Sequence, residues 1–255
     1  MKSYIKELKN SIRKKIWFEM ERRGIARFPI PLTHRIPNFQ GAEEAANRLA
    51  QMNIFKKAKV IKVNPDSPQL PVRKLVLMSG KILIVPTPRL RQGFLLLDPN
   101  VIPKYLIPRA VTIRGSFIYG KFVKPWDLPN IDLIVVGSVA VNTDGVRIGK
   151  GGGYAELEYA ILREFNKVHE STPIITTVHD IQIINNKIPR EPHDLVVDYI
   201  ITPTKIIEIK NKAPKPRGII WDLVTYDKLR EIPILKEIAN RKGIRLKYSN
   251  SNEPP

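Results

Sequence analysis

Residues 131–158 read IDLIVVGSVAVNTDGVRIGKGGGYAELE, and this stretch decides the fold. The β-branched run at residues 131–136 predicts a buried strand. A turn is expected at residues 142–145, and a basic, glycine-rich loop follows it. The residues after the loop have the apolar spacing of a helix, and its predicted inward face consists of Leu157, Ile161, Phe165 and Val168. The stretch therefore predicts a strand that leads through a turn and a glycine loop into a helix.

The glycine loop carries Arg147, Lys150 and the four glycines Gly149, Gly151, Gly152 and Gly153. Glycine lets backbone N–H groups come close to a ligand, and a helix N-terminus adds partial positive charge. These features predict a phosphate-binding loop, with a mobile glycine turn as the alternative. The loop is not a Walker A motif, because no Ser or Thr follows Lys150, and it lacks the third glycine of the dinucleotide fingerprint.

Polar residues follow several other predicted strands at the points where these strands end. Strands are expected at residues 58–63, 81–85, 173–178 and 196–201. The polar residues that follow the last three are Thr87, Arg89, Arg91 and Gln92, then His179 and Asp180, then Thr202. In open α/β sheets, the loops at the carboxyl ends of strands bind ligands. The loop at residues 87–89 is therefore predicted to form a second wall of the site.

Helices are predicted at residues 3–23, 41–53, 72–78 and 227–241 from their apolar spacing, with Gly24 ending the first. The alternation of helices and strands favours a single α/β domain with a mostly parallel, twisted sheet. Five prolines at residues 93–130 predict a long, partly irregular insertion with a short strand at residues 111–114. A proline-containing linker is expected at residues 210–217, and a disordered tail at residues 249–255.

The composition restricts the class of protein. The 255 residues contain no cysteine, which excludes disulfides and thiolate metal sites and favours a cytoplasmic protein. No uncharged apolar run reaches membrane-spanning length, and the N-terminus lacks the apolar core of a signal peptide. A net charge of +19 predicts affinity for polyanions such as RNA. General enrichment in Lys and Arg, as in a thermophile, is the alternative.

Three segments together resemble the 5-formyltetrahydrofolate cyclo-ligase (methenyltetrahydrofolate synthetase) family. They are Lys9-x-x-Ile12-Arg13, then residues 147–154 (RIGKGGGY), then Gln182, Pro189, His193, Asp194, Val197, Asp198 and Thr202 in order. A narrower set resembles the methenyltetrahydrofolate synthetase domain-containing proteins. It consists of residues 15–17 (KIW), 28–29 (FP), 35–39 (RIPNF), 85–90 (VPTPRL) and 149–160.

The resemblance implies an α/β domain over residues 1–243 of the CoA-transferase-like type, with an N-terminal helix and connector at residues 1–40 and a tail at residues 244–255. It also implies an enzyme that uses ATP and Mg²⁺ to convert 5-formyltetrahydrofolate to 5,10-methenyltetrahydrofolate. Apart from the resemblance, we expect a monomer or dimer that does not associate with membranes. Carried over by position, the phosphate-holding residues are Lys9, Arg13, Arg147, Lys150, Tyr154 and the backbone of Gly149, Gly151, Gly152 and Gly153. Arg147, Lys150 and Tyr154 are the implied catalytic residues, and Glu156 and Asp198 the implied metal ligands.

The chain departs from the family pattern on the folate side. Tyr154-Ala155-Glu156 replaces the family's Tyr-Tyr-Asp, so one tyrosine is absent and the carboxylate is one methylene longer. The family's folate-holding glutamate should lie near residues 66–69, where Asp66 is the nearest acid. Asp198 is open to a second interpretation, as a structural ion pair with Arg147 or Lys150. Two other functions also stay open: a non-catalytic RNA-binding protein that reuses the fold, and an ATP-binding regulatory protein without turnover.

Overall fold

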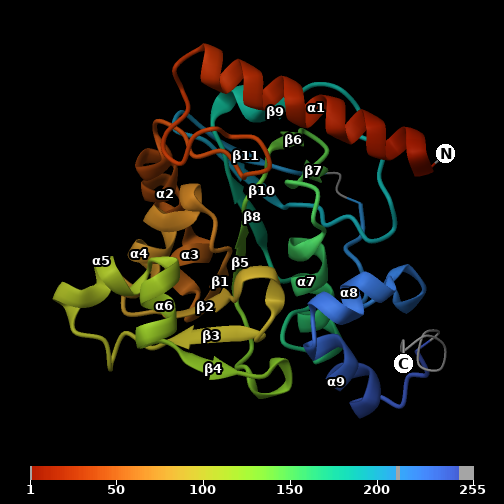
Figure 1. The fold of residues 1–255 in the computed structure, drawn as a ribbon. Coiled ribbons are helices and arrows are strands. Elements are labelled where there is room, and N and C mark those ends of the chain that lie inside the picture. Colours follow the sequence, from red (N-terminus) through yellow and green to blue (C-terminus); the bar gives the residue numbers. More distant parts are fainter. Residues whose placement is uncertain (1, 211–212, 247–255) are drawn as a thin grey trace.

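The computed structural model of the chain describes residues 2–210 and 213–246, which form one α/β domain (Figure 1). Its centre is an eight-stranded sheet in the order β11-β10-β8-β5-β1-β2-β3-β4. The five inner strands from β10 to β2 run parallel. Their bounds are β1 (Val60–Val63), β2 (Ile82–Pro86), β5 (Leu133–Val136), β8 (Ile174–Thr177) and β10 (Tyr199–Ile201). The predicted parallel sheet is confirmed.

Three antiparallel strands complete the edges of this sheet. They are β3 (Phe94–Leu97), β4 (Lys121–Val123) and β11 (Ile206–Glu208). A second, three-stranded sheet has the order β7-β6-β9. It contains β6 (Ala140–Asn142), β7 (Arg147–Ile148) and β9 (Ile183–Ile184). This small sheet carries the chain from β5 to the glycine loop.

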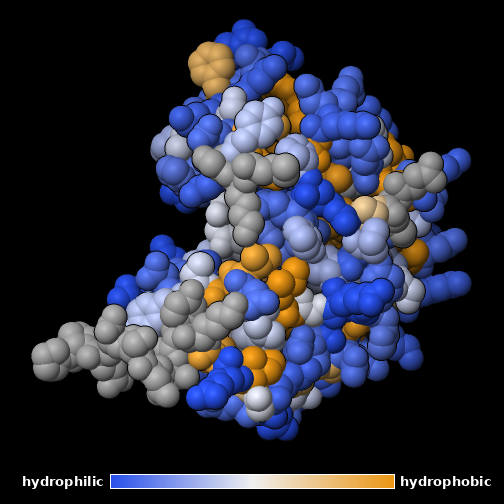
Figure 2. All heavy atoms as spheres, turned by 90° about the vertical axis from the view of Figure 1, so that its right-hand side faces the viewer, coloured by the Kyte–Doolittle hydropathy of each residue, from blue (hydrophilic) through white to orange (hydrophobic). Residues whose placement is uncertain are grey.

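Helices cover both faces of the large sheet, because successive side chains of each strand point to opposite faces. In β1, Ile61 and Val63 pack in the core formed with α2 (Ala42–Gln51) and α4 (Leu70–Met78). Val60 packs in the core formed with α7 (Tyr154–Glu164) and α9 (Ile234–Arg241). Figure 1 shows α2–α4 to the left of the sheet and α7–α9 to its right. The right-hand face is mostly hydrophilic on its surface, with smaller hydrophobic areas between (Figure 2).

The first helix, α1 (Lys2–Arg22), crosses the small sheet at the top of the molecule in Figure 1. Ile16, Trp17 and Met20 of α1 are buried in the core. Gly24 has a φ of +66°, a left-handed conformation that suits glycine at the end of a helix. The predicted first helix and its end at Gly24 are therefore confirmed.

The segment predicted as an irregular insertion is more regular than its prolines suggested. Besides β3 and β4 it contains α5 (Ile107–Ala110) and α6 (Ile113–Tyr119). The strand predicted at residues 111–114 is wrong, because Thr112 caps α6 by accepting a hydrogen bond from the N–H of Gly115. A short helix α3 (Asn53–Lys57) follows α2.

The strand predicted at residues 131–136 is confirmed as β5, and β6 follows it in the small sheet. One other predicted element is divided. The predicted last helix forms α8 (Tyr226–Glu231) and α9, which are separated at Ile232 and Pro233 because a proline cannot continue the hydrogen bonds of a preceding helix. The predicted tail at residues 249–255 lies outside the described residues. Within the described ranges, no helix combines the length and apolar character that crossing a bilayer requires.

Candidate functional site

A pocket of about 590 Å³ lies at the carboxyl ends of the parallel strands. In the sheet, β2 lies on one side of β1 and β5 lies on the other. The strand order therefore reverses between β1 and β5. Crevices of this kind bind ligands in open α/β sheets. The loops at residues 64–67, after β1, and 87–89, after β2, line the pocket together with Gly137, after β5. The wall predicted at residues 87–89 is thus confirmed, whereas Arg91 and Gln92 lie outside the lining.

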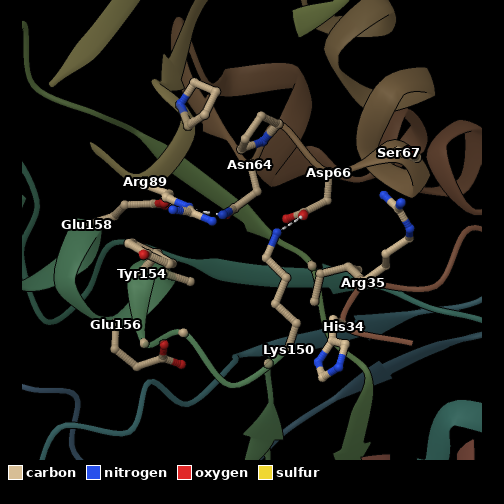
Figure 3. Close-up of a pocket in the computed structure, with 18 of the residues that line it drawn as sticks. His34, Arg35, Asn64, Asp66, Ser67, Arg89, Lys150, Tyr154, Glu156 and Glu158 are labelled. Atoms are coloured by element: carbon tan, nitrogen blue, oxygen red, sulfur yellow. Dashed lines mark hydrogen bonds and ion pairs between the residues drawn. The ribbon is translucent and has the colours of Figure 1, made fainter. Parts of the chain in front are cut away.

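The glycine loop forms the opposite wall and opens α7, as the sequence predicted. Gly149, Lys150, Gly152 and Gly153 line the pocket. Gly153 precedes the helix with a φ of +68°, a left-handed conformation that any L side chain would strain. The unpaired N–H groups at the start of α7 therefore lie at the pocket. Lys150 reaches across to Asp66, with 2.8 Å between its Nζ and Oδ1 of Asp66 (Figure 3).

Arg147 lies beneath this loop and is 3% exposed. Its Nη2 donates to the carbonyl of Gly137 at 2.8 Å, its Nε to the hydroxyl of Ser138 at 3.3 Å, and its Nη1 to Glu156. These contacts fix the guanidinium and hold Glu156 at the pocket wall. Oε2 of Glu156 accepts no hydrogen bond from the described chain, so a carboxylate oxygen is open to a cation there. Carboxylate oxygens are the ligands that Mg²⁺ prefers, and Glu156 fits this role.

The two predicted phosphate ligands on α1 lie behind the loop instead of in the pocket lining. Nε of Arg13 donates to the carbonyl of Gly149 at 2.7 Å, and burial lowers the pKa of Arg13. Nζ of Lys9 contacts Asp194 at 2.6 Å and Glu191 at 3.0 Å. In the structure Arg13 supports the loop, and Lys9 ties α1 to the segment at residues 191–194. That both hold phosphate stays a prediction. Gly151, which packs towards Arg13, is also outside the lining.

Tyr154, a predicted catalytic residue, lines the pocket but is engaged with α8. Its hydroxyl donates to Oε1 of Glu231 at 2.5 Å, and Nζ of Lys228 lies 3.9 Å from its ring centroid. Burial, helped by the bond to Glu231, raises the pKa of Tyr154 to about 12. Arg89 approaches the same carboxylate at 3.5 Å, from a backbone φ of +55°. The phenol of Tyr154 is thus neutral and acts as a hydrogen-bond donor at the start of α7, and it is not available as a general base.

Asp198, the second predicted metal ligand, does not line the pocket. It precedes β10, so it lies at the amino end of a parallel strand, opposite the edge that holds the pocket. Its carboxylate accepts from the N–H of Ile174 at 2.7 Å and contacts Nζ of Lys215 at 2.8 Å. The predicted pairing with Arg147 or Lys150 is wrong, and the metal role is corrected to a structural ion pair.

The structure also places a buried charged group in the pocket that sequence reasoning missed. Lys62 on β1 pairs with Glu158 on α7 and donates to Oδ1 of Asn64 at 2.9 Å. Nδ2 of Asn64 donates to the same Glu158 oxygen at 3.2 Å. Burial raises the pKa of Glu158, and the Lys62 ammonium opposes that rise. The signal available in the sequence was a lysine inside the apolar strand at residues 58–63.

The connector after α1 contributes the remaining charged wall. His34 and Arg35 both line the pocket and are exposed. His34, predicted to be structural or exposed, packs edge-on against Trp17 with ring centroids 5.9 Å apart. Arg35 is the pocket-lining arginine that has no carboxylate partner among the described residues. The described lining balances its charges: the cations are Arg35, Arg89, Arg147 and Lys150, and the carboxylates are Asp66, Glu156, Glu158 and Glu231.

Comparison with known proteins gives a family match over most of the chain. The model of the 5-formyltetrahydrofolate cyclo-ligase family matches residues 5–203. The methenyltetrahydrofolate synthase domain-containing protein of Mus musculus is 47% identical over 242 residues, which cover 92% of this chain and 64% of that protein. The protein of the same name from Danio rerio is 45% identical over 257 residues, which cover 97% of this chain and 67% of that one. The chain thus spans just under two-thirds of the mouse relative.

A solved structure shares the fold. The NMR structure of Aquifex aeolicus 5,10-methenyltetrahydrofolate synthetase has a TM-score of 0.51 and 21% identity. The match covers 80% of this chain and 93% of that one. At this identity the likeness establishes the arrangement of helices and strands alone.

Proposed function

Because the chain belongs to the 5-formyltetrahydrofolate cyclo-ligase family, we propose that it uses MgATP to convert 5-formyltetrahydrofolate, or a related reduced folate, to the 5,10-methenyl form. The observation that carries this proposal is the glycine loop, which lines the crevice where the strand order reverses. Lys150 of this loop and the start of α7 both lie at the pocket. Such a wall supplies backbone donors and positive charge for a polyphosphate.

Different residues of the pocket have different proposed roles. Phosphoryl transfer mainly requires positioning and neutralisation of negative charge. We assign phosphate binding to Lys150 and to the backbone N–H groups of Gly152 and Gly153. Asp66 now neutralises Lys150, and an incoming phosphate would take its place as the partner of that ammonium. Arg13 acts from behind by holding the carbonyl of Gly149.

Glu156 is the residue that we assign to Mg²⁺. Arg147 fixes one of its oxygens and leaves the other towards the pocket. Bound MgATP would supply the phosphoryl group that activates the formyl oxygen of the folate. Glu156 is one methylene longer than the aspartate of the family pattern. The buried guanidinium of Arg147 still holds this longer side chain in one position.

Turnover is the direct test. Purified protein with 5-formyltetrahydrofolate and MgATP should produce the methenyl absorbance band, and omission of ATP or chelation of Mg²⁺ should abolish it. Thermal melting with nucleotides and folates provides the binding control, because a ligand that prefers the native state raises the melting temperature. Folded protein that binds MgATP without forming product would contradict the enzyme and favour a regulatory nucleotide-binding role.

A second candidate function, RNA binding, is favoured by the location of the excess charge. The net charge is +19, yet the pocket lining is balanced, so the excess lies elsewhere. The outer face of α1 contributes exposed Lys6, Lys14 and Lys15, beside exposed Tyr4 and Phe18. Lysines attract phosphates, and aromatic rings stack on bases.

Single-stranded RNA affinity should therefore fall steeply as salt is raised. Replacing Lys6, Lys14 and Lys15 by Glu should weaken the binding while MgATP affinity is unchanged. Negligible RNA affinity at low salt would remove this candidate and leave the enzymatic proposal intact.

A further inference from the structure

The Lys62–Glu158 pair differs from an ordinary buried ion pair because one of its oxygens faces a cavity. Glu158 is 3% exposed and lines the pocket. Lys62 and Asn64 both donate to Oε2 of Glu158. Within the described residues, no protein group donates to Oε1. Because Glu158 lines the pocket, this oxygen is available to a ligand or water.

The chemistry of the surroundings selects what can bind there. The Lys62 ammonium already touches the carboxylate, so a second cation, such as a divalent metal ion, would be repelled. A neutral N–H donor meets no such repulsion and gains a charge-assisted hydrogen bond. The open oxygen therefore favours an amine or ring N–H of a ligand.

The walls beside Glu158 favour a flat ligand. Tyr154 lies four residues earlier on α7 and therefore on the same helix face. Figure 3 shows Tyr154 and Asn64 next to Glu158, at the end of the pocket away from His34 and Arg35. Pro65 and Pro88 also line the pocket. A phenol ring and proline faces suit contact with a planar ring.

We propose that Glu158, held by Lys62 and Asn64, is the anchor for the amino group of a planar heterocycle. Two ligand sources share this chemistry: the 2-amino pteridine of a reduced folate and the 6-amino purine of ATP. The inference rests on the proposed function only for the identity of these two sources. Lys62 and Asn64 are positioning residues, because each acts through Glu158.

Matched pairs of ligands test the anchor without any turnover. Wild-type affinity is measured by calorimetry for ATP against inosine triphosphate, and for 2-amino-4-oxopteridine against 2,4-dioxopteridine. In each pair, the second compound has an oxygen in place of the amine. Wild-type protein should prefer the amine in one pair by roughly 10- to 100-fold, the range expected for a hydrogen bond to a charged group. The preferred pair identifies the source.

Glu158→Gln should abolish that preference. Because the variant leaves Lys62 buried without a carboxylate, its folding is checked by thermal melting. The double variant Lys62→Met with Glu158→Gln removes both charges and should fold where the single variant does not. Asp198→Asn is the matched control, since it disrupts an equally buried pair outside the pocket and should keep the preference.

Two outcomes overturn the proposal. One is a wild-type protein that shows no amine preference in either pair or binds none of the four compounds. The other is a preference that survives in folded Glu158 variants. If the Glu158 variants lose the amine preference but the wild-type protein never forms the methenyl product, the anchor is supported and the proposed reaction is contradicted. If Glu158→Gln forms the methenyl product as fast as the wild type, the proposed reaction is supported and the anchor is contradicted.

Discussion

Two buried lysine–carboxylate pairs at opposite edges of the parallel strands show how location decides what a buried charge does. In Lys62–Glu158 the side chains are 2% and 5% exposed, and in Lys215–Asp198 they are 1% and 4% exposed. By burial alone the two pairs are equivalent. Glu158 lies at the carboxyl edge of the parallel strands and faces the pocket, whereas Asp198 lies at the amino edge.

The partners of the two lysines complete the contrast. Lys215 also donates to the carbonyls of Glu170 and Thr172, at 2.9 and 2.8 Å, so it joins the segment after β11 to the loop before β8. Lys62 donates instead to Asn64, a side chain that itself lines the pocket. The first pair connects backbone segments, and the second organises a ligand-facing surface. A buried ion pair therefore indicates a site only when its position in the sheet does so too.

The largest expected effect is on stability, at the pair outside the pocket. Asp198→Ala leaves the Lys215 ammonium buried without its carboxylate and should cost about 3–5 kcal/mol of unfolding free energy. Urea denaturation measures the loss. Glu237→Ala is the control, because it breaks the exposed pair with Lys124 and should cost less than about 1 kcal/mol. Folded Asp198→Ala with impaired MgATP affinity would contradict the separation between the two pairs.

The same contrast explains what the sequence could and could not predict. The parallel strands and the glycine loop are local signals: β-branched runs, turn residues and glycines next to a helical pattern. Asp198 was misplaced because a strand predicted over residues 196–201 does not show at which edge its first polar residue lies. In the structure, β10 begins only at Tyr199, so Asp198 sits at its amino end.

Glu158 was missed for a different reason. Its role depends on Lys62 and Asn64, which are almost 100 residues away in sequence and meet it only through packing of α7 on β1. The helices at residues 93–130 were not predicted, because the prolines there were interpreted as signs of irregular structure. Prolines also begin helices, and Pro108 lies in the first turn of α5. The partners of Lys9 and Arg13 likewise depend on how α1 crosses the small sheet.

A third pair, Lys150–Asp66, extends the comparison to a solvent-accessible position in the pocket. The Lys150 side chain is 41% exposed, so the pair should add little to stability. Lys150→Met should leave the melting temperature nearly unchanged and weaken MgATP binding roughly 10- to 100-fold, as expected for lost charge-assisted hydrogen bonds. Calorimetry measures the affinity. Lys6→Met removes an equal charge from the outside of α1 as the control, and equal affinities for both variants would exclude Lys150 from the phosphate site.

The smallest effect is expected at Tyr154 and Glu231, the least buried carboxylate contact in the series. The hydrogen bond from Tyr154 lowers the pKa of Glu231 below its ordinary value of 4.5. The unfolded chain therefore binds a proton more readily, so this stabilisation is present above pH 4.5 and is lost as the pH falls through the lowered pKa. Tyr154→Phe should lower the free energy of unfolding by about 1 kcal/mol at neutral pH and by progressively less in acid.

Urea denaturation midpoints, measured from neutral to acidic pH, give this difference, with Tyr119→Phe as a control. A cost for Tyr154→Phe that stays constant down to low pH would show that Glu231 is not its partner in solution.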